Sequence, residues 1–230
     1  MVSTVLITGS SRGIGLALVK QFQAAGWNVI GAVRNPATSE KLQALSPYKI
    51  VQLDTADEES IERAANELNG QAIDLLINNA GICADEEYAT MTKEAMMRQF
   101  EVNAVGPFLV SRTFVPHLQA AVTINGRAKL VHISTKLSSI SLNDGTRGWP
   151  GYRMSKSALN MMHMSLTHEF NPLKVACAVV CPGYVATDFN LYRGLLQVDD
   201  SAAAVAKVIA AFSFEDTGKF FNNQGEIFPW

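Results

Sequence analysis

The sequence has only three cysteines in 230 residues, Cys83, Cys177 and Cys181. They form no C-x-x-C pair and no spacing that suits zinc, and they fall in or beside apolar runs. The four histidines also lack a ligand spacing with carboxylates or cysteines. We therefore expect reduced core cysteines and no metal site.

An excess of one charge is also absent, because 19 basic residues face 21 acidic ones and the formal net charge is -2. The two signs are mixed along the chain, which gives no electrostatic footprint for nucleic acid. No apolar stretch is long enough to span a bilayer, and residues 1–7 begin a β-type run without a basic region before it. We expect a cytoplasmic protein whose partners include neither nucleic acid nor a membrane.

Apolar residues are abundant, at 48% of the chain, which is enough to bury one sizeable core. No repeat or linker divides the sequence, so residues 1–230 are expected to form a single domain. Apolar β-type runs alternate with helix-sized segments, which predicts an α/β protein with a doubly wound parallel sheet and helices on both faces. About seven strands are predicted, at Val2–Thr8, Asn28–Val33, Lys49–Leu53, Ile73–Ile77, Lys129–Ser134, Lys174–Val180 and, more weakly, Lys219–Asn222.

A long helical segment is predicted between the fourth and fifth strands, over Thr92–Ala121. Gly106-Pro107 is expected to bend it, because proline lacks the N–H that continues a helix. Its methionines and phenylalanines recur at helical intervals, which indicates core packing or a subunit contact rather than a ligand groove.

A glycine-rich turn follows the first predicted strand directly and opens a helix. Glycines let the backbone approach a ligand closely, and a helix N-terminus favours the negative charge of a pyrophosphate. In this strand-turn-helix context the turn predicts dinucleotide binding. The residues concerned are Gly9, Ser11, Arg12, Gly13, Ile14 and Gly15.

Arg34 stands at the end of the second predicted strand, where a fold that selects an unphosphorylated ribose often places an acidic residue. Its guanidinium, together with that of Arg12, would bind a 2′-phosphate through charge-assisted hydrogen bonds. NADP(H) is therefore favoured over NAD(H). The alternative is that Arg34 is only a solvated residue at a strand end.

Two further strand ends carry candidate cofactor residues. Asp54 follows the third predicted strand and would accept from the adenine amino group, or it would cap the next helix. Asn79, Ala80 and Gly81 follow the fourth strand, where the backbone would pass beside the adenosine ribose, or they form a plain turn.

Taken in chain order, these motifs, Asn103, the Tyr152/Lys156 pair and Pro182-Gly183 resemble the short-chain dehydrogenase/reductase family over nearly the full length. The run from Tyr152 to Asn160 and the C-terminal residues look most like its C-factor and sniffer-type carbonyl reductase branch. The resemblance implies a Rossmann-type fold, a homodimer or homotetramer paired through two long helices, and a small carbonyl or alcohol substrate. It also implies that Asn103 is a helix-bending amide that retains a water in a proton relay.

Tyr152 and Lys156 lie four residues apart and so share one face of a predicted helix. A tyrosine titrates near 10, and a positive charge within about 4–6 Å lowers such a pKa by about 1–3 units. We therefore expect Lys156 to make the Tyr152 phenol a usable proton donor and acceptor beside the carbonyl. By resemblance, Lys156 also holds the ribose hydroxyls of the cofactor.

The residue that binds the substrate oxygen departs from the family pattern, which usually has a serine there. Thr135 occupies the matching position, and its hydroxyl has the same hydrogen-bonding capacity with fewer rotamers. Ser134, Ser138 and Ser139 remain alternatives if the loop has a different register. We favour Thr135, because strand alternation puts residues 133 and 135 on the same face.

The segment after the sixth predicted strand is expected to lie over the nicotinamide, by resemblance, through Pro182, Gly183, Val185 and Thr187. Residues 188–196, Trp149 and the loop 142–148 would form an apolar wall and lid. These features favour a hydrophobic aldehyde or ketone as substrate. The alternative is a cofactor-binding signalling protein of the C-factor type with weak or no catalysis.

Overall fold

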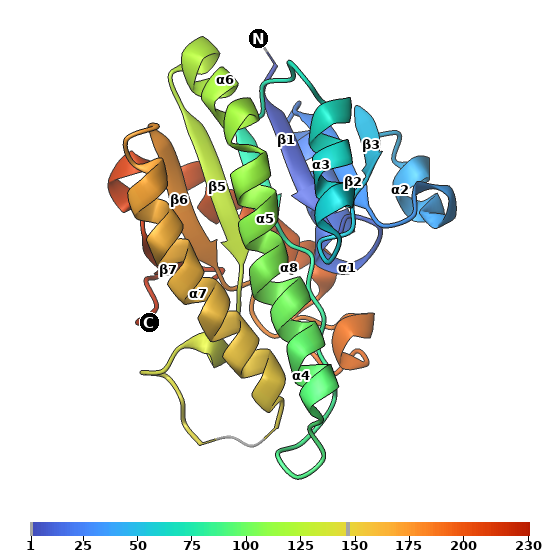
Figure 1. Ribbon diagram of the computed structural model, residues 1–230, viewed down its shortest axis with the longest axis vertical. Coiled ribbons are helices and arrows are strands. Elements are labelled where there is room, and N and C mark those ends of the chain that lie inside the picture. The colour runs from blue at the N-terminus through green and yellow to red at the C-terminus, as the bar shows by residue number, and fades with distance from the viewer. Residues whose placement is uncertain (1, 146–147) are drawn as a thin grey trace.

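The protein forms one seven-stranded sheet in which every neighbouring pair of strands is parallel, in the order β3-β2-β1-β4-β5-β6-β7 (Figure 1). The structure is a computed structural model that describes residues 2–145 and 148–230. All seven predicted strands are confirmed, with ends that shift by one or two residues. Their bounds are β1 Thr4–Thr8, β2 Asn28–Val33, β3 Lys49–Gln52, β4 Leu75–Asn78, β5 Ala128–Ile133, β6 Val175–Val180 and β7 Lys219–Phe221.

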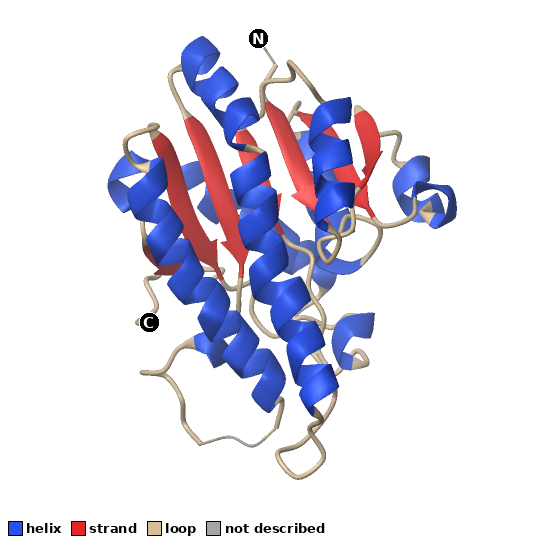
Figure 2. Ribbon diagram, in the orientation of Figure 1, coloured by secondary structure: helices blue, strands red, loops and turns tan. Residues whose placement is uncertain are grey.

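The strands read as nearly continuous apolar runs because helices cover both faces of the sheet, as Figure 2 shows. Strands β1, β4 and β6 are buried at every residue. The chain first adds strands on one side of β1 and then crosses to the other side at β4, which makes this the topological switch point. Ligands of open α/β sheets bind outside the carboxyl ends of the strands at such a point.

The helices form two layers, one on each face of the sheet (Figure 1). Helix α1 (Gly13–Ala24) packs against α8 (Val198–Ala211) on one face. The other face is covered by α3 (Glu58–Glu67), α5 (Gly106–Thr113), α6 (Val115–Asn125) and α7 (Pro150–Phe170), and α2 (Glu40–Ala44) lies beside the β3 edge. Each layer encloses its own apolar core. The predicted Rossmann-type architecture is therefore confirmed.

The predicted long helix is interrupted by a π-helical turn. Helix α4 (Lys93–Phe100) leads into the π-helix η2 (Glu101–Val105), which leads into α5. Pro107 stands in the first turn of α5 and has no N–H to donate to the carbonyl of Asn103, four residues earlier. The interruption of the helix thus lies one turn before Gly106-Pro107, where the bend was predicted, and Asn103 is at its centre.

Two cysteines and two histidines are core residues. Cys177 and Cys181 are buried, whereas Cys83 lies in the loop after β4 rather than in a strand and is only partly buried. His132 on β5 and His163 on α7 are fully buried, with their Nδ1 atoms 2.9 Å apart. Burial lowers the pKa of both imidazoles, to about 3 for His163. Both rings are neutral at physiological pH.

No helix in the part of the chain that the structure describes is both long and apolar enough to cross a bilayer.

Candidate active site

A cavity of about 310 Å³ opens at the carboxyl ends of the strands. Thr135, Tyr152 and Lys156 line it at the β5 end, and Phe189 closes over them. Every residue predicted to contact the cofactor also lines this cavity: Gly9, Ser11, Arg12, Gly13, Ile14, Gly15, Arg34, Asp54, Asn79, Ala80, Gly81, Pro182, Gly183, Val185 and Thr187. The fold therefore brings the separate sequence motifs into one place.

The glycine-rich turn needs glycine for two different reasons, backbone conformation and close packing. Gly9 has a φ of 67°, which side chains disfavour. At Gly15, an added Cβ would lie 2.3 Å from the Gly9 carbonyl oxygen and 2.5 Å from the Asn79 amide nitrogen. The turn is thus packed tightly beneath the N-terminus of α1, whose first N–H groups face the cavity and suit a pyrophosphate.

Asn79 and Thr8 fasten this turn to the end of β4. The Asn79 side-chain amide donates to the carbonyls of Thr8 and Gly9, at 2.9 and 3.3 Å. In return, the Thr8 hydroxyl accepts from the backbone N–H groups of Asn79 and Ala80, at 3.0 and 3.1 Å. Asn79 is therefore a structural link between β1 and β4, which adds to the plain turn and the ribose contact that the sequence suggested.

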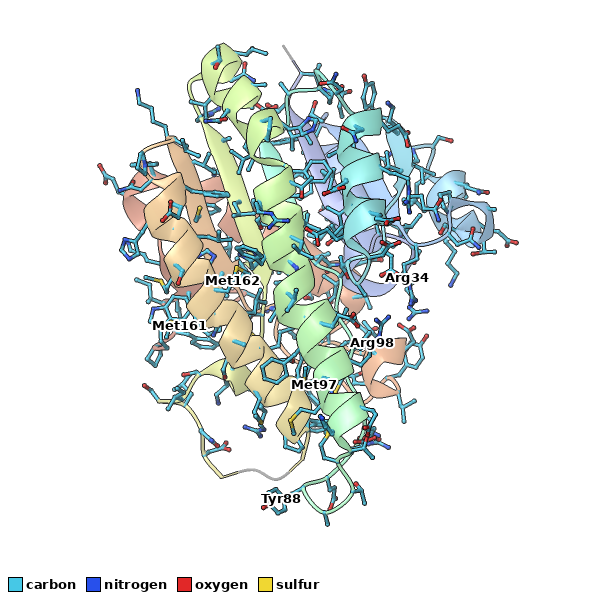
Figure 3. All side chains as sticks on the ribbon, viewed as in Figure 1. Arg34, Tyr88, Met97, Arg98, Met161 and Met162 are labelled. Carbon is cyan, nitrogen blue, oxygen red and sulfur yellow. The ribbon has the colours of Figure 1, made fainter. Side chains whose placement is uncertain are left out.

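Two arginines stand where the cavity opens beside β2. Arg34 is exposed and lines the cavity, and so does Arg98 of α4; Figure 3 shows both on the same side of the molecule. Arg12 is not free, since its Nε lies 2.7 Å from a carboxylate oxygen of Asp188 across the opening. Arg98 carries an ion pair with Glu101, at 2.5 Å. Arg34 has no ion pair among the residues that the structure describes.

Asp54 lines the cavity below β3 and is not the cap of the next helix. Its Oδ1 accepts from the Ala56 N–H at 3.0 Å, in a local turn. The N-cap of α3 is instead Asp57, whose carboxylate accepts from the Ser60 N–H at 3.2 Å. The capping role that the sequence left open for Asp54 is therefore wrong, and the adenine contact stays a prediction.

Tyr152 and Lys156 both reach the cavity from the first two turns of α7. Lys156 is 4% exposed, and its Nζ donates to the Ile133 carbonyl at 2.9 Å. No hydrogen bond joins this ammonium to the Tyr152 phenol among the residues that the structure describes. Burial lowers the pKa of Lys156 to about 8.

The expected lowering of the Tyr152 pKa by Lys156 is wrong in this structure, where burial has the larger effect. Part of the Tyr152 ring stays accessible, but burial of the phenol raises its pKa well above the usual value. The neighbouring thiols of Cys83 and Cys181 act in the same direction, and a hydrogen bond with the Thr135 side chain opposes them. The effect of burial on the Tyr152 pKa outweighs that of the Lys156 charge, because the ammonium points toward the Ile133 carbonyl.

Thr135 is the hydroxyl residue that faces Tyr152: both line the cavity, and the Thr135 side chain lowers the pKa of the phenol. The alternatives have other partners: Ser134 bonds to Asn160, and Ser138 to the Thr135 carbonyl. The Ser139 hydroxyl donates to the Pro229 carbonyl at 2.7 Å. Of these four residues, Thr135 is therefore the one whose side chain is found to act on the phenol within the described parts of the chain.

Asn103 lies behind the cavity rather than in its wall, and it is fully buried. Its Nδ2 donates to the Ile82 carbonyl and to the Ser155 hydroxyl, at 2.8 and 3.0 Å. Its Oδ1 accepts from the Ile82 N–H at 2.8 Å. Both amide hydrogens are therefore used, and the side chain fastens the loop after β4 to the π-helix and to α7.

The segment after β6 closes over the site in a way that sequence reasoning described only as an apolar wall. The Phe189 ring meets the Tyr152 ring edge to face, with centroids 5.5 Å apart. A bridge between Val185 and Leu196 closes the base of this segment. Leu191 and Tyr192 both have positive φ, at 55° and 60°, which is strained for side chains of this size.

Asp85, in the loop after β4, was missed by the sequence analysis. It accepts from the Trp149 indole N–H at 3.1 Å and lies 3.8 Å from the Arg193 guanidinium. All three side chains line the cavity, so Asp85 joins the loops on both sides of its mouth. No local motif marks such a residue, because its partners are distant in sequence. Residues 146–147 of the expected lid loop lie outside the described residues.

The fold and the cavity define a dinucleotide-binding α/β oxidoreductase site. A nicotinamide dinucleotide fits the residues present: a glycine turn in which a Cβ at Gly9 or Gly15 would collide with neighbouring atoms, a helix N-terminus, and a Tyr/Lys pair at the far end. The sequence matches the short chain dehydrogenase family over residues 3–194, and the protein belongs to that family. It is accordingly an NAD(P)-dependent oxidoreductase that acts on a small molecule.

Similar proteins include carbonyl reductases and the C-signal of a bacterium. The chain is 34% identical to the C-signal of Myxococcus xanthus over 69% of this chain and 93% of that protein. It is 32% identical to an NADPH-bound carbonyl reductase from chicken fatty liver, with a TM-score of 0.89 and coverage of 100% and 99% of the two chains. The carbonyl reductase Sniffer of D. melanogaster is 27% identical, with a TM-score of 0.93 over the full length of both chains.

Proposed function

We propose that the protein is an NADPH-dependent carbonyl reductase for hydrophobic aldehydes or ketones, working as the single domain 1–230. One observation carries this proposal: a single cavity brings Thr135, Tyr152 and Lys156 together with the glycine cradle of α1. The similarity to an NADPH-bound carbonyl reductase supports it. When bound, the cofactor supplies a hydride to the carbonyl carbon, or accepts one in the reverse direction.

The side chains at the β5 end then have separate tasks. Thr135 donates a hydrogen bond to the substrate oxygen, and Tyr152 gives that oxygen its proton as negative charge develops. The raised pKa of Tyr152 keeps the phenol protonated at neutral pH, which suits a proton donor in the direction of reduction. Lys156 holds the ribose hydroxyls, and Asn103 fixes the π-helix that supports a water relay.

The apolar end of the cavity supports the proposed class of substrate. Phe189, Leu191 and Leu137 line the cavity around Tyr152, and the neighbouring Cys83 thiol is neutral because burial raises its pKa to about 12. A charged group here would lose hydration without a fixed partner, because Arg193 is already opposite Asp85. Uncharged carbonyl compounds therefore fit this end best.

The proposal is tested by titrating the purified protein with NADPH and NADH and then assaying a panel of aliphatic and aromatic aldehydes and ketones. Turnover of apolar members with NADPH is the expected result. The identity to the C-signal favours a second candidate, a cofactor-binding signalling protein. Tight NADPH binding without turnover of any panel member would favour that candidate.

Arg34→Asp is expected to weaken NADPH binding about 10- to 100-fold, because charge-assisted hydrogen bonds to the 2′-phosphate would be replaced by repulsion. NADH binding should stay equal or improve, since a carboxylate accepts from ribose hydroxyls. Dissociation constants from fluorescence titration provide the measurement. Arg127→Asp makes the same charge change at the exposed residue before β5, at the amino-terminal end of the strands and away from the cavity, and should leave both constants unchanged. Equal loss of both cofactors in the Arg34 variant would contradict 2′-phosphate recognition.

We also propose that the protein pairs with itself through α4 and α7 and that it is cytoplasmic. Met97, Met154 and Met161 are 58%, 48% and 71% exposed on these helices, and Figure 3 shows Met97 and Met161 on the side that faces the viewer. Such exposed methionines suit a contact surface between subunits. Light scattering should give a mass of two or four times 24.9 kDa; a monomer at micromolar concentration would count against it.

A further inference from the structure

The inner face of α7 stays polar beyond Lys156, although it packs on the sheet. Asn160 lies one helical turn after Lys156 and is 4% exposed. Facing it are Ser134, which directly follows β5, and Ser138, which ends the short helix after it; they are 2% and 3% exposed. We name Ser134, Ser138 and Asn160 the amide cluster. Polar groups this deeply buried must bond to one another, because each unpaired one costs about 1–3 kcal/mol.

The hydrogen bonds of the amide cluster have one direction. The Ser134 hydroxyl donates to Asn160 Oδ1 at 2.8 Å, and Asn160 Nδ2 donates to the Ser138 hydroxyl at 2.8 Å. Ser138 then gives its own hydrogen to the Thr135 carbonyl at 2.6 Å. Asn160 acts as an acceptor on one side and a donor on the other, a combination that only an amide of this length provides here.

The amide cluster ends at the residue that faces the phenol. The Thr135 carbonyl accepts from both the N–H and the hydroxyl of Ser138, at 3.0 and 2.6 Å. The Thr135 hydroxyl accepts from the Leu137 N–H at 3.2 Å and lines the cavity with Tyr152. The Ser157 hydroxyl also donates to the Ser138 carbonyl at 2.8 Å. Helix α7 therefore holds both Tyr152 and the short helix η3 (Lys136–Ser138), which sets the backbone of Thr135.

We propose that Asn160 is a positioning residue. Through Ser138, it holds the Thr135 hydroxyl in the position that faces the Tyr152 phenol. The threonine methyl group leaves few rotamers, so the direction of the hydroxyl depends on where the backbone is held. This inference rests on the proposed function, in which Thr135 and Tyr152 bind the carbonyl oxygen.

The experiment compares Asn160→Ala and Ser138→Ala with Thr167→Val as the matched control. Thr167 lies two turns further along the buried face of α7, is 6% exposed and donates to the His163 carbonyl at 2.9 Å. Each of the three variants loses a buried hydrogen bond of this helix. Only the bonds lost in Asn160→Ala and Ser138→Ala belong to the chain of hydrogen bonds that ends at Thr135. Tyrosine labelled with 13C at Cζ gives one signal for each of the five tyrosines, and Tyr152→Phe assigns the signal of interest.

We expect the Tyr152 signal to move in Asn160→Ala and Ser138→Ala and to stay in place in Thr167→Val. The turnover number should fall about tenfold in the first two, the loss of about one hydrogen bond, while the NADPH dissociation constant stays within about twofold. The double variant Asn160→Ala/Ser138→Ala should be no worse than either single variant, because both break one path.

The possible outcomes separate this inference from the proposed function. A Tyr152 signal that is unchanged in both variants, or that moves as much in Thr167→Val, overturns the positioning role whether or not the wild type has activity. A wild type that reduces no carbonyl while the signal moves as expected overturns the reductase proposal alone. If Asn160→Ala does not fold, Ser138→Ala carries the test, because it breaks the same link with a smaller cavity.

Discussion

Tyr152→Phe is expected to reduce carbonyl turnover by about 10²- to 10⁴-fold, the usual contribution of a positioned proton donor. The ring remains and keeps its edge-to-face contact with Phe189, so the cavity keeps its shape. Only the hydroxyl that would protonate the substrate oxygen is removed. Steady-state kinetics with the most reactive panel member measures the loss, and a fluorescence titration should give an NADPH dissociation constant close to that of the wild type.

Tyr48→Phe is the matched control, because Tyr48 is 56% exposed and stands before β3, away from the cavity. It should keep full activity. Comparable turnover in Tyr152→Phe and the wild type would refute the proton-donor role. The pH dependence adds a second check: because burial raises the pKa of Tyr152, the protonated form needed for reduction persists through neutral pH. Reduction should therefore show no loss attributable to this phenol between pH 6 and about 8.

Gly15→Ala is expected to abolish measurable cofactor binding and to destabilise the fold by about 1–3 kcal/mol. The added methyl carbon would lie 2.3 Å from the Gly9 carbonyl oxygen, and that backbone atom has little freedom to move away. Relief requires the glycine turn to separate from Asn79, which distorts the cradle for the pyrophosphate. Thermal unfolding and NADPH titration measure the two effects.

Gly26→Ala is the control that distinguishes backbone strain from damage to the glycine turn that would bind the pyrophosphate. Gly26 has a φ of 79°, and nothing lies within 4 Å of the position that its Cβ would take. Alanine there should cost about 1–2 kcal/mol through the backbone alone, with cofactor affinity unchanged. If Gly15→Ala bound NADPH as tightly as Gly26→Ala does, the glycine turn would not be the pyrophosphate site.

The sheet was predictable from sequence because its central strands are covered on both faces and so read as unbroken apolar runs. Residues 28–33 and 175–180 illustrate this, since the predicted and observed strands there differ by one residue at most. The π-helix around Asn103 was indicated only as a bend, because the proline that causes it acts on a carbonyl four residues away. Its position depends on which bond is lost rather than on local propensity.

The cavity wall was predictable to the extent that motifs follow strand ends, which all meet at one edge of a parallel sheet. Contacts between distant loops were not predictable in this way. Asp85 and Phe189 belong to no motif, and their partners lie 64 and 37 residues away. The direction of the Tyr152 pKa was also wrong, since spacing along a helix shows proximity to Lys156 but not burial or the direction of the ammonium.

The ion pair between Arg12 and Asp188 makes a substitution at Arg12 different from one at Arg34. The Arg12 guanidinium, which we proposed for the 2′-phosphate, also pairs with Asp188 in the segment after β6, so replacing Arg12 is expected to alter both cofactor selection and access to the cavity. Arg34 has no ion pair among the described residues. On the proposed preference for NADPH, a substitution at Arg34 is therefore expected to change cofactor selection alone, whereas a substitution at Arg12 also removes the contact that holds Asp188.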